Sequence, residues 1–170
     1  MDIEVIKKLI AKHTTGHAEV IVNALTAERY YRNKNDILYS KKTEDMTENP
    51  LRSADNRVPR NFYGLLVSQK ASYMFTAPPL FDVGSQQSNQ MIADTLGDIY
   101  AKNCKTLCVN ASNAGIAWIH YWKDETGEFE YGVVDSKQII PIWSTHLSKE
   151  LLAVLRVYKN IDDEGKSWDI

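Results

Sequence analysis

The sequence predicts an α+β fold, with a helical N-terminal two-thirds packed on a C-terminal antiparallel β-meander. Apolar residues recur every three or four positions up to about residue 110, and about every second position from residue 115 onward. No strand–helix–strand alternation favours a parallel sheet. A length of 170 residues suits one domain. We therefore expect residues 1–170 to form a single α+β domain.

Composition places the chain among ordinary globular proteins. Hydrophobic residues make up 44% and charged residues 25% of the chain, which excludes a collagen, a disulfide scaffold and a mainly disordered chain. The formal net charge of −2 lacks the basic surplus typical of nucleic-acid binders. No apolar run reaches the roughly 18 residues of a membrane span, and the acidic start is unlike a secretory signal. We expect no membrane partner.

The first elements are two helices followed by a polar loop. Residues 2–12 carry isoleucine and leucine on one helical stripe, and the Thr-Thr-Gly sequence at 14–16 ends that helix. Helical spacing resumes over residues 17–32. Residues 40–56 are polar, of mixed charge and without periodicity, so we expect an exposed loop.

Two further helices and a short strand are expected before the sheet. A helix is predicted to start at Val58-Pro59 and to stop at Ala77-Pro78-Pro79, where the prolines cannot continue its hydrogen bonds. Gly64 lies inside this helix and lowers its propensity by about 1 kcal/mol relative to Ala. A short strand over residues 80–83 and one long helix over residues 86–110 follow.

The last third is predicted to be strands that pair in sequence order. Alternating apolar residues begin after Gly115, and the turn signal Asp-Glu-Thr-Gly predicts a hairpin. The expected strands cover residues 116–123, 129–133, 139–143, 151–158 and 167–170. The final strand begins a hairpin that the sequence does not complete, so we expect this chain to be a fragment of a longer protein.

Patterns that carry chemistry are sparse, and we expect no catalytic, cofactor or metal site. Cys104 and Cys108 lack the Cys-x-x-Cys spacing of redox and zinc sites. A small enzyme that used either thiol as nucleophile would need a base such as His120 or His146. The aromatic residues of the sheet could instead stack single-stranded nucleic acid, although Lys123 alone adds positive charge there. Both functions remain alternatives.

Two neighbouring segments form a distinctive pattern: Asn56–Phe62 reads N-R-V-P-R-N-F, and Lys70–Pro79 ends the helix that follows. They resemble a hallmark of phage portal proteins from tailed siphophages and prophages of Gram-positive bacteria. In that family a stretch like N-R-[IV]-P-x-N-F precedes a helix ending in Lys-x-x-Tyr-hydrophobic-x-x-Pro-Pro. Further similar segments follow in the family's order: Tyr30-Tyr31, Asn35–Leu38, Gly115–Trp118, Gln138–Trp143 and Leu155–Tyr158. The matches run from Tyr30 to Trp168.

The resemblance implies a structural subunit of the portal ring, usually of twelve subunits, at one capsid vertex. DNA is packaged and ejected through this ring, and head-completion and tail proteins attach to it. The implied role is not enzymatic, because the ATPase belongs to terminase. The implied partners are other portal subunits, capsid and scaffolding proteins, terminase, the head-completion protein and double-stranded DNA. The implied locations are the virion and, during assembly, the host cytoplasm.

Family members are several times longer than this chain, so it resembles the N-terminal part of the outer wing. The stem, clip and crown lie outside it, and contacts with terminase and the head-completion protein are expected there. The densest Arg/Tyr groups are candidates for contacts between subunits, since such residues are enriched at interfaces. They are Tyr30, Tyr31, Arg57, Arg60 and Tyr63. The alternative is that they stabilise the fold of one subunit.

Overall fold

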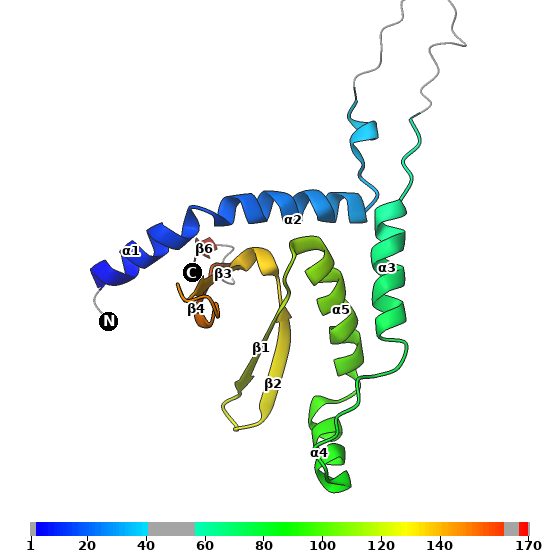
Figure 1. The fold of residues 1–170 in the computed structure, drawn as a ribbon, viewed down its shortest axis with the longest axis vertical. Helices are drawn as coiled ribbons and strands as arrows, with labels where there is room; N and C mark the ends of the chain where they lie inside the picture. Colours follow the sequence, from blue (N-terminus) through cyan, green and yellow to red (C-terminus); the bar gives the residue numbers. More distant parts are fainter. Residues whose placement is uncertain (1–2, 41–56, 162–166, 170) are drawn as a thin grey trace, which may run out of the picture.

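A computed structural model describes residues 3–40, 57–161 and 167–169 and shows an elongated α+β arrangement (Figure 1). Helices α1 (Ile3–Thr14) and α2 (His17–Tyr31) follow one another along one side of the molecule. The two match the predicted helices closely. The expected loop beyond Ser40, over residues 41–56, and the chain end at Ile170 lie outside the described residues.

The third helix begins later than predicted, because an asparagine marks its first turn. Helix α3 (Phe62–Met74) starts after Asn61, and not at Val58. The Asn61 Oδ1 atom accepts a hydrogen bond from the Gly64 N–H at 3.0 Å and so caps the helix. The prolines after Ala77 lie beyond its end, as expected.

The single helix expected over residues 86–110 is two helices, α4 (Gln86–Leu96) and α5 (Ile99–Ala114). The break is at Gly97, whose φ of 65° and ψ of 179° form a backbone conformation largely restricted to glycine. Its N–H still bonds the Ala93 carbonyl at 2.9 Å and closes α4. The positive φ turns the chain, so α5 starts in a new direction (Figure 1).

Residues Leu80–Val83 form no strand, contrary to expectation. The Val83 N–H bonds the side chain of Asn89 at 2.9 Å, and the Gly84 N–H bonds the side chain of Asp82 at 3.0 Å. These side-chain acceptors use backbone donors that a strand would give to its neighbour. The segment is therefore a turn that leads into α4.

The strands that the structure describes form three separate two-stranded antiparallel ladders, rather than one continuous meander. They are β1 (Trp118–Lys123), β2 (Phe129–Val134), β3 (Ile139–Trp143), β4 (Leu151–Arg156), β5 (Lys159–Ile161) and β6 (Ser167–Asp169). Each pairs with its sequence neighbour. The short 3₁₀ helix η2 (Ser136–Gln138) turns the chain after β2, so β3 starts a new ladder. The α+β class is confirmed, and the joined meander is not formed.

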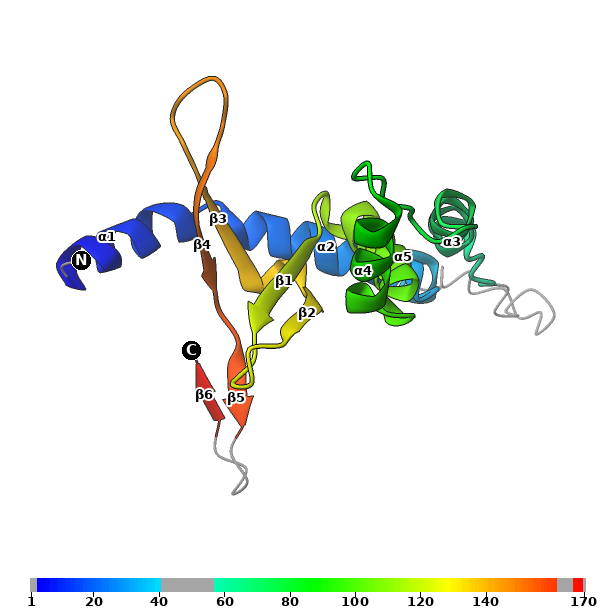
Figure 2. The same cartoon turned by 90° about the horizontal axis from the view of Figure 1, so that it is seen from below.

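The buried core is small and follows the contacts of α2 with α3 and α5, and of α5 with β2. Its apolar members are Ala24, Val67, Ala71, Cys104, Val134, Ile139, Ile140 and Ile142. Many apolar side chains instead lie at the surface, including Phe62, Leu66 and Tyr73 on the outer side of α3. Figure 2 shows α3 beyond α5, on the side away from the β1–β2 hairpin.

We expect Gly64→Ala to lower the free energy of unfolding by roughly 1 kcal/mol, although Ala is the better helix former. A Cβ at this position would lie 2.5 Å from side-chain atoms of Asn61. That side chain also donates to the Tyr31 carbonyl at 3.2 Å, so it cannot move without losing two hydrogen bonds. Denaturant unfolding followed by circular dichroism measures the change.

An Asn61→Ala background provides the control, because it removes the side chain that the new methyl group would strike. There Gly64→Ala should raise the free energy of unfolding by about 1 kcal/mol, the ordinary gain in helix propensity. Destabilisation of similar size in both backgrounds would contradict the role given to the Asn61 cap.

Candidate functional site

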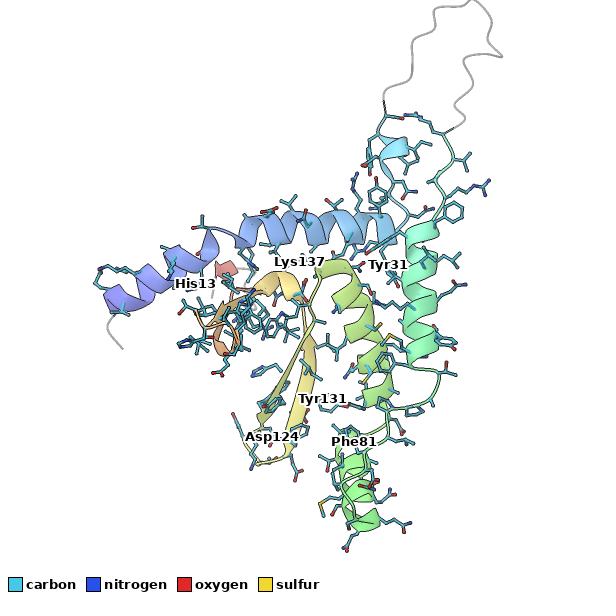
Figure 3. All side chains as sticks on the ribbon, viewed as in Figure 1. His13, Tyr31, Phe81, Asp124, Tyr131 and Lys137 are labelled. Atoms are coloured by element: carbon cyan, nitrogen blue, oxygen red, sulfur yellow. The ribbon has the colours of Figure 1, made fainter. Side chains whose placement is uncertain are left out.

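The five predicted interface residues, hereafter the Arg/Tyr cluster, lie around the junction of α2 with α3. Helix α2 ends at Tyr31, and Asn33 then adopts a left-handed φ of 60°. The chain turns there into the short 3₁₀ helix η1 (Asp36–Leu38). Figure 3 places Tyr31 at this end of α2, beside the first turn of α3. Tyr30, Tyr31, Arg57, Arg60 and Tyr63 thus come from three segments that meet.

Tyr30 stabilises the turn that follows α2. Its hydroxyl donates to the Asp36 carboxylate, which also pairs with the Arg29 guanidinium. The Tyr30 hydrogen bond and then the Arg29 hydrogen bond lower the pKa of Asp36, and the same bond raises the pKa of Tyr30. The Arg29 guanidinium also lies over the rings of Tyr30 and Tyr39, at 5.3 and 5.8 Å from their centroids.

Two asparagine side chains join the end of α2 to the start of α3. Asn35 donates to the Arg60 carbonyl at 3.0 Å, and Asn61 donates to the Tyr31 carbonyl at 3.2 Å. The Tyr31 hydroxyl lies 3.4 Å from the Ser68 hydroxyl on α3. The Tyr31 carbonyl, left without a helical partner at the end of α2, therefore finds its donor at the cap of the next helix.

Arg57 and Tyr63 extend the junction to η1 and α5. Arg57 donates to the Ser40 carbonyl at 2.7 Å, so it connects the chain before α3 to the residues after η1. The Tyr63 hydroxyl lies 3.1 Å from the Ser112 carbonyl and 3.0 Å from Asn113 Oδ1 near the end of α5. Burial raises the pKa of Tyr63, which therefore stays a neutral donor.

Four members of the Arg/Tyr cluster thus have partners within their own chain, and Arg60 differs. Its side chain is exposed and makes no hydrogen bond or ion pair among the residues that the structure describes. Sequence reasoning missed the roles of Asn35 and Asn61, whose side chains join the end of α2 to the start of α3. The sequence does show that asparagine favours helix caps and turns. It does not show which distant carbonyls these two side chains bond, because such contacts leave no local pattern.

A second junction centres on Lys137 in η2 and connects α2 to the strands. The Lys137 ammonium pairs with Glu28 of α2 and with Asp135, at 3.0 Å in the second case. The His17 Nε2 atom lies 3.0 Å from the Lys137 carbonyl, which can only accept, so His17 donates. Burial opposes the charge, but the hydrogen bonds that the ammonium donates to both carboxylates outweigh it and raise the pKa of Lys137. Figure 3 shows Lys137 directly under α2.

The cysteines lie in a groove of about 530 Å³ between α3 and α5. Cys104 is buried, and the Cys108 thiol lies 3.8 Å from the Met74 sulfur. Within the described residues neither cysteine hydrogen-bonds a histidine, and the His120 ring instead lies 5.4 Å from that of Trp122. This geometry gives no support to a thiol nucleophile, which needs an adjacent base.

One aromatic face of the β1–β2 hairpin packs on the helices. Tyr131 donates to the Leu96 carbonyl at the end of α4, and its ring lies 6.0 Å from Tyr100 of α5. Phe129 lies 5.9 Å from Tyr131 and 6.3 Å from Tyr121 on the same face. Tyr131 is therefore held against the helices, whereas Tyr121 and Phe129 remain 68% and 40% exposed. Residues 118–134 carry four carboxylates and one lysine, which gives no support to the stacking of single-stranded nucleic acid.

Metal and membrane features were also sought in the part of the chain that the structure describes. Across residues 3–40, 57–161 and 167–169, no three His, Cys, Asp or Glu side chains gather as a metal-binding group. Among the helices so described, none has the length and apolar character needed to cross a membrane.

Residues 10–170 match the sequence model of the family described as phage portal protein, SPP1 Gp6-like. The chain therefore belongs to this family of phage portal proteins, and the resemblance drawn from its motifs is confirmed. It is 43% identical over 175 residues to the portal protein of Clostridium phage phiCD119, covering 96% of this chain and 38% of that protein. It is 28% identical over 167 residues to the portal protein of Bacillus phage SPP1, covering 92% and 31%. The chain thus spans about a third of the length of these curated relatives.

We expect Lys137→Met to lower the free energy of unfolding by about 1–3 kcal/mol, since it leaves two carboxylates without their cation. The Lys137 and Glu28 side chains are only 19% and 28% exposed. Because the pKa of Lys137 is raised, the stabilisation that its ammonium provides is complete below the ordinary lysine pKa of 10.5. It is lost as pH rises through the higher pKa of Lys137 in the folded protein. Thermal unfolding at neutral and alkaline pH measures both effects.

Lys102→Met on the exposed side of α5 is the matched control and should change the unfolding free energy by less than about 0.5 kcal/mol. Equal effects of the two substitutions would show that Lys137 does not hold a junction.

We expect Tyr30→Phe to raise the pKa of Asp36 toward its ordinary value, because the substitution removes the strongest hydrogen bond to that carboxylate. An NMR titration of the Asp36 carboxyl carbon measures this shift directly. Tyr31→Phe, which removes a hydroxyl that bonds Ser68 instead, is the control and should leave the Asp36 titration unchanged. An Asp36 pKa that is the same in all three proteins would contradict the described turn.

Proposed function

We propose that this chain is part of a structural subunit of a phage portal, the ring at one capsid vertex through which DNA is packaged and ejected. The supporting observation is the family match over residues 10–170, together with two relatives that are both portal proteins. The chain contributes a scaffold and not a catalyst. The junctions at the Arg/Tyr cluster and at Lys137 suit this role, because they fix helices and strands at set angles.

The proposed partners follow from the same role. Neighbouring portal subunits, usually twelve in the ring, and capsid and scaffolding proteins would contact this region, in the virion and during assembly in the host cytoplasm. The chain spans about a third of its relatives, so contacts with terminase, the head-completion protein and DNA are proposed for the whole protein. The chain itself is proposed as one domain of the outer wing.

The Arg/Tyr cluster is proposed to lie at or beside the contact between subunits. Tyr30, Tyr31, Arg57 and Tyr63 would fix the shape of that surface through their bonds within the chain. Arg60 would reach the neighbouring subunit itself, since its guanidinium is exposed. Arginine is a frequent source of binding energy at protein interfaces.

Light scattering on a sizing column, at several concentrations, tests the proposal. The mass is expected to rise from 19.4 kDa to a large multiple, with closed rings visible by negative-stain electron microscopy. Arg60→Ala should weaken association at least fivefold, whereas Lys34→Ala, another exposed cation near the junction, should not. A mass of 19.4 kDa at every concentration would contradict ring formation by this chain.

A further inference from the structure

We propose that the outer face of α3 in one chain binds the outward face of the β1–β2 hairpin in a second copy, head to tail. This inference rests on the proposed ring, and it names the two surfaces through which neighbouring subunits meet. In the part of the chain that the structure describes, the outer side of α3 and the turn end of that hairpin face are exposed, although Val134 at the other end of the face is buried. Each surface carries features that the other complements.

The outer face of α3 is apolar and exposed. Gly64, Val67 and Ala71 point inward and are buried, so the opposite side of the helix faces solvent. That side consists of Phe62, Leu65, Leu66 and Tyr73 with Gln69 as a polar member, and Lys70 lies at its edge beside the groove between α3 and α5. The Phe62, Leu66 and Tyr73 side chains are 67%, 64% and 87% exposed. An apolar stripe of this kind on a surface helix marks an interaction site.

The second surface is the side of the β1–β2 hairpin that faces away from α5. Side chains alternate across a strand, so the residues next to Tyr121 and Tyr131 along each strand point to the face opposite those two rings. His120, Trp122 and Glu130 occupy that face, and Trp122 stands directly opposite Glu130 in the ladder. All three are exposed, and Trp122 is 43% exposed. Trp122 also lies against Gly132, where a Cβ would be 3.7 Å from its ring.

The two surfaces point to opposite sides of the molecule. Helix α5 packs against α3 on one side and against β2 on the other. Both views show α5 between α3 and the hairpin (Figures 1 and 2). Two different faces on opposite sides form a heterologous contact, which repeats from copy to copy and closes into a ring when the rotation allows.

The charges of the two surfaces are complementary, which favours a second copy as the occupant. From Arg57 to Phe81 the chain carries Arg57, Arg60 and Lys70 and no acidic residue. Residues 118–134 carry four carboxylates and one lysine, a net charge of −3. Contact between α3 and a hairpin joins opposite charges, whereas two α3 faces or two hairpins would repel. The Arg60 side chain, exposed just before α3, adds to the basic side.

Zero-length carbodiimide cross-linking tests the contact, because it joins a lysine only to a carboxylate that touches it. A 1:1 mixture of ¹⁴N- and ¹⁵N-labelled chain, at a concentration where the mass exceeds 19.4 kDa, is cross-linked and digested. We expect peptides that join Lys70 to a carboxylate of residues 124–130, with mixed isotope pairs that prove a link between chains. Lys70→Gln should abolish them, and Lys102→Gln on α5 should not. If the sample associates but these peptides are absent, the proposal is overturned. The same result is expected if another segment of a longer protein covers α3.

Charge reversal separates this contact from the proposed ring itself. Lys70→Glu and Glu130→Lys should each weaken association about tenfold. Mixing the two variants should restore association, since each supplies the charge that the other lacks. Both positions are exposed, and thermal unfolding confirms that the variants fold. Association that neither variant changes would overturn this surface and leave the ring intact. A wild-type chain that never associates would overturn both.

Discussion

The strands of this protein depend on the junction at Lys137. A two-stranded ladder is marginally stable in water by itself, and the described strands form three of them. Each ladder must therefore be held by other elements. The Lys137 ammonium reaches Glu28 near the end of α2, while its carbonyl accepts from His17 at the start of the same helix. One residue thus fixes the connection between β2 and β3 against nearly the whole length of α2, and the Ser136 hydroxyl adds a bond to the Ile116 carbonyl before β1.

The small core explains why such polar junctions carry so much of the architecture. Its buried apolar residues are mostly alanine, valine and isoleucine, and none of the large side chains among the described residues is fully buried. The hydrophobic effect scales with the apolar area removed from water, so a chain with this much exposed apolar surface gains little from its own folding. In the proposed assembly, association would supply part of the remaining gain, and the exposed faces of α3 and of the hairpin would contribute to the stability of the assembled protein.

Much of the fold could be predicted because its local signals are strong. Helical periodicity and the Thr-Thr-Gly break at 14–16 place α1 and α2, and the turn sequence after Lys123 places the first hairpin. The break at Gly97 was missed, because a glycine can continue a helix or end it, and only the positive φ decides. The division into three ladders was missed for a related reason. The direction in which η2 turns the chain depends on Lys137 and its distant partners, which no local pattern records.

The predicted site shows the same limit. Composition identified the Arg/Tyr cluster, but the acceptors of Tyr63 and Arg57 lie 49 and 17 residues away in sequence. Asn61 was read only as part of a motif, and the structure gives its physical reason: one side chain caps α3 and also bonds the end of α2. The sequence motif that identifies the portal family thus also connects α2 to α3 through the side chain of Asn61.

Within that hallmark, inward and outward roles alternate over a few residues. Arg57, Asn61 and Tyr63 bond to their own chain, whereas Arg60 and Phe62 are exposed. The exposed residues therefore lie on a helix whose orientation is set on two sides, since α3 packs against both α2 and α5. A ring closes only when every subunit keeps the same angle between its two contact surfaces. Small errors in that angle would add up around many subunits, so a portal subunit needs stiffness between its interfaces more than it needs a large core.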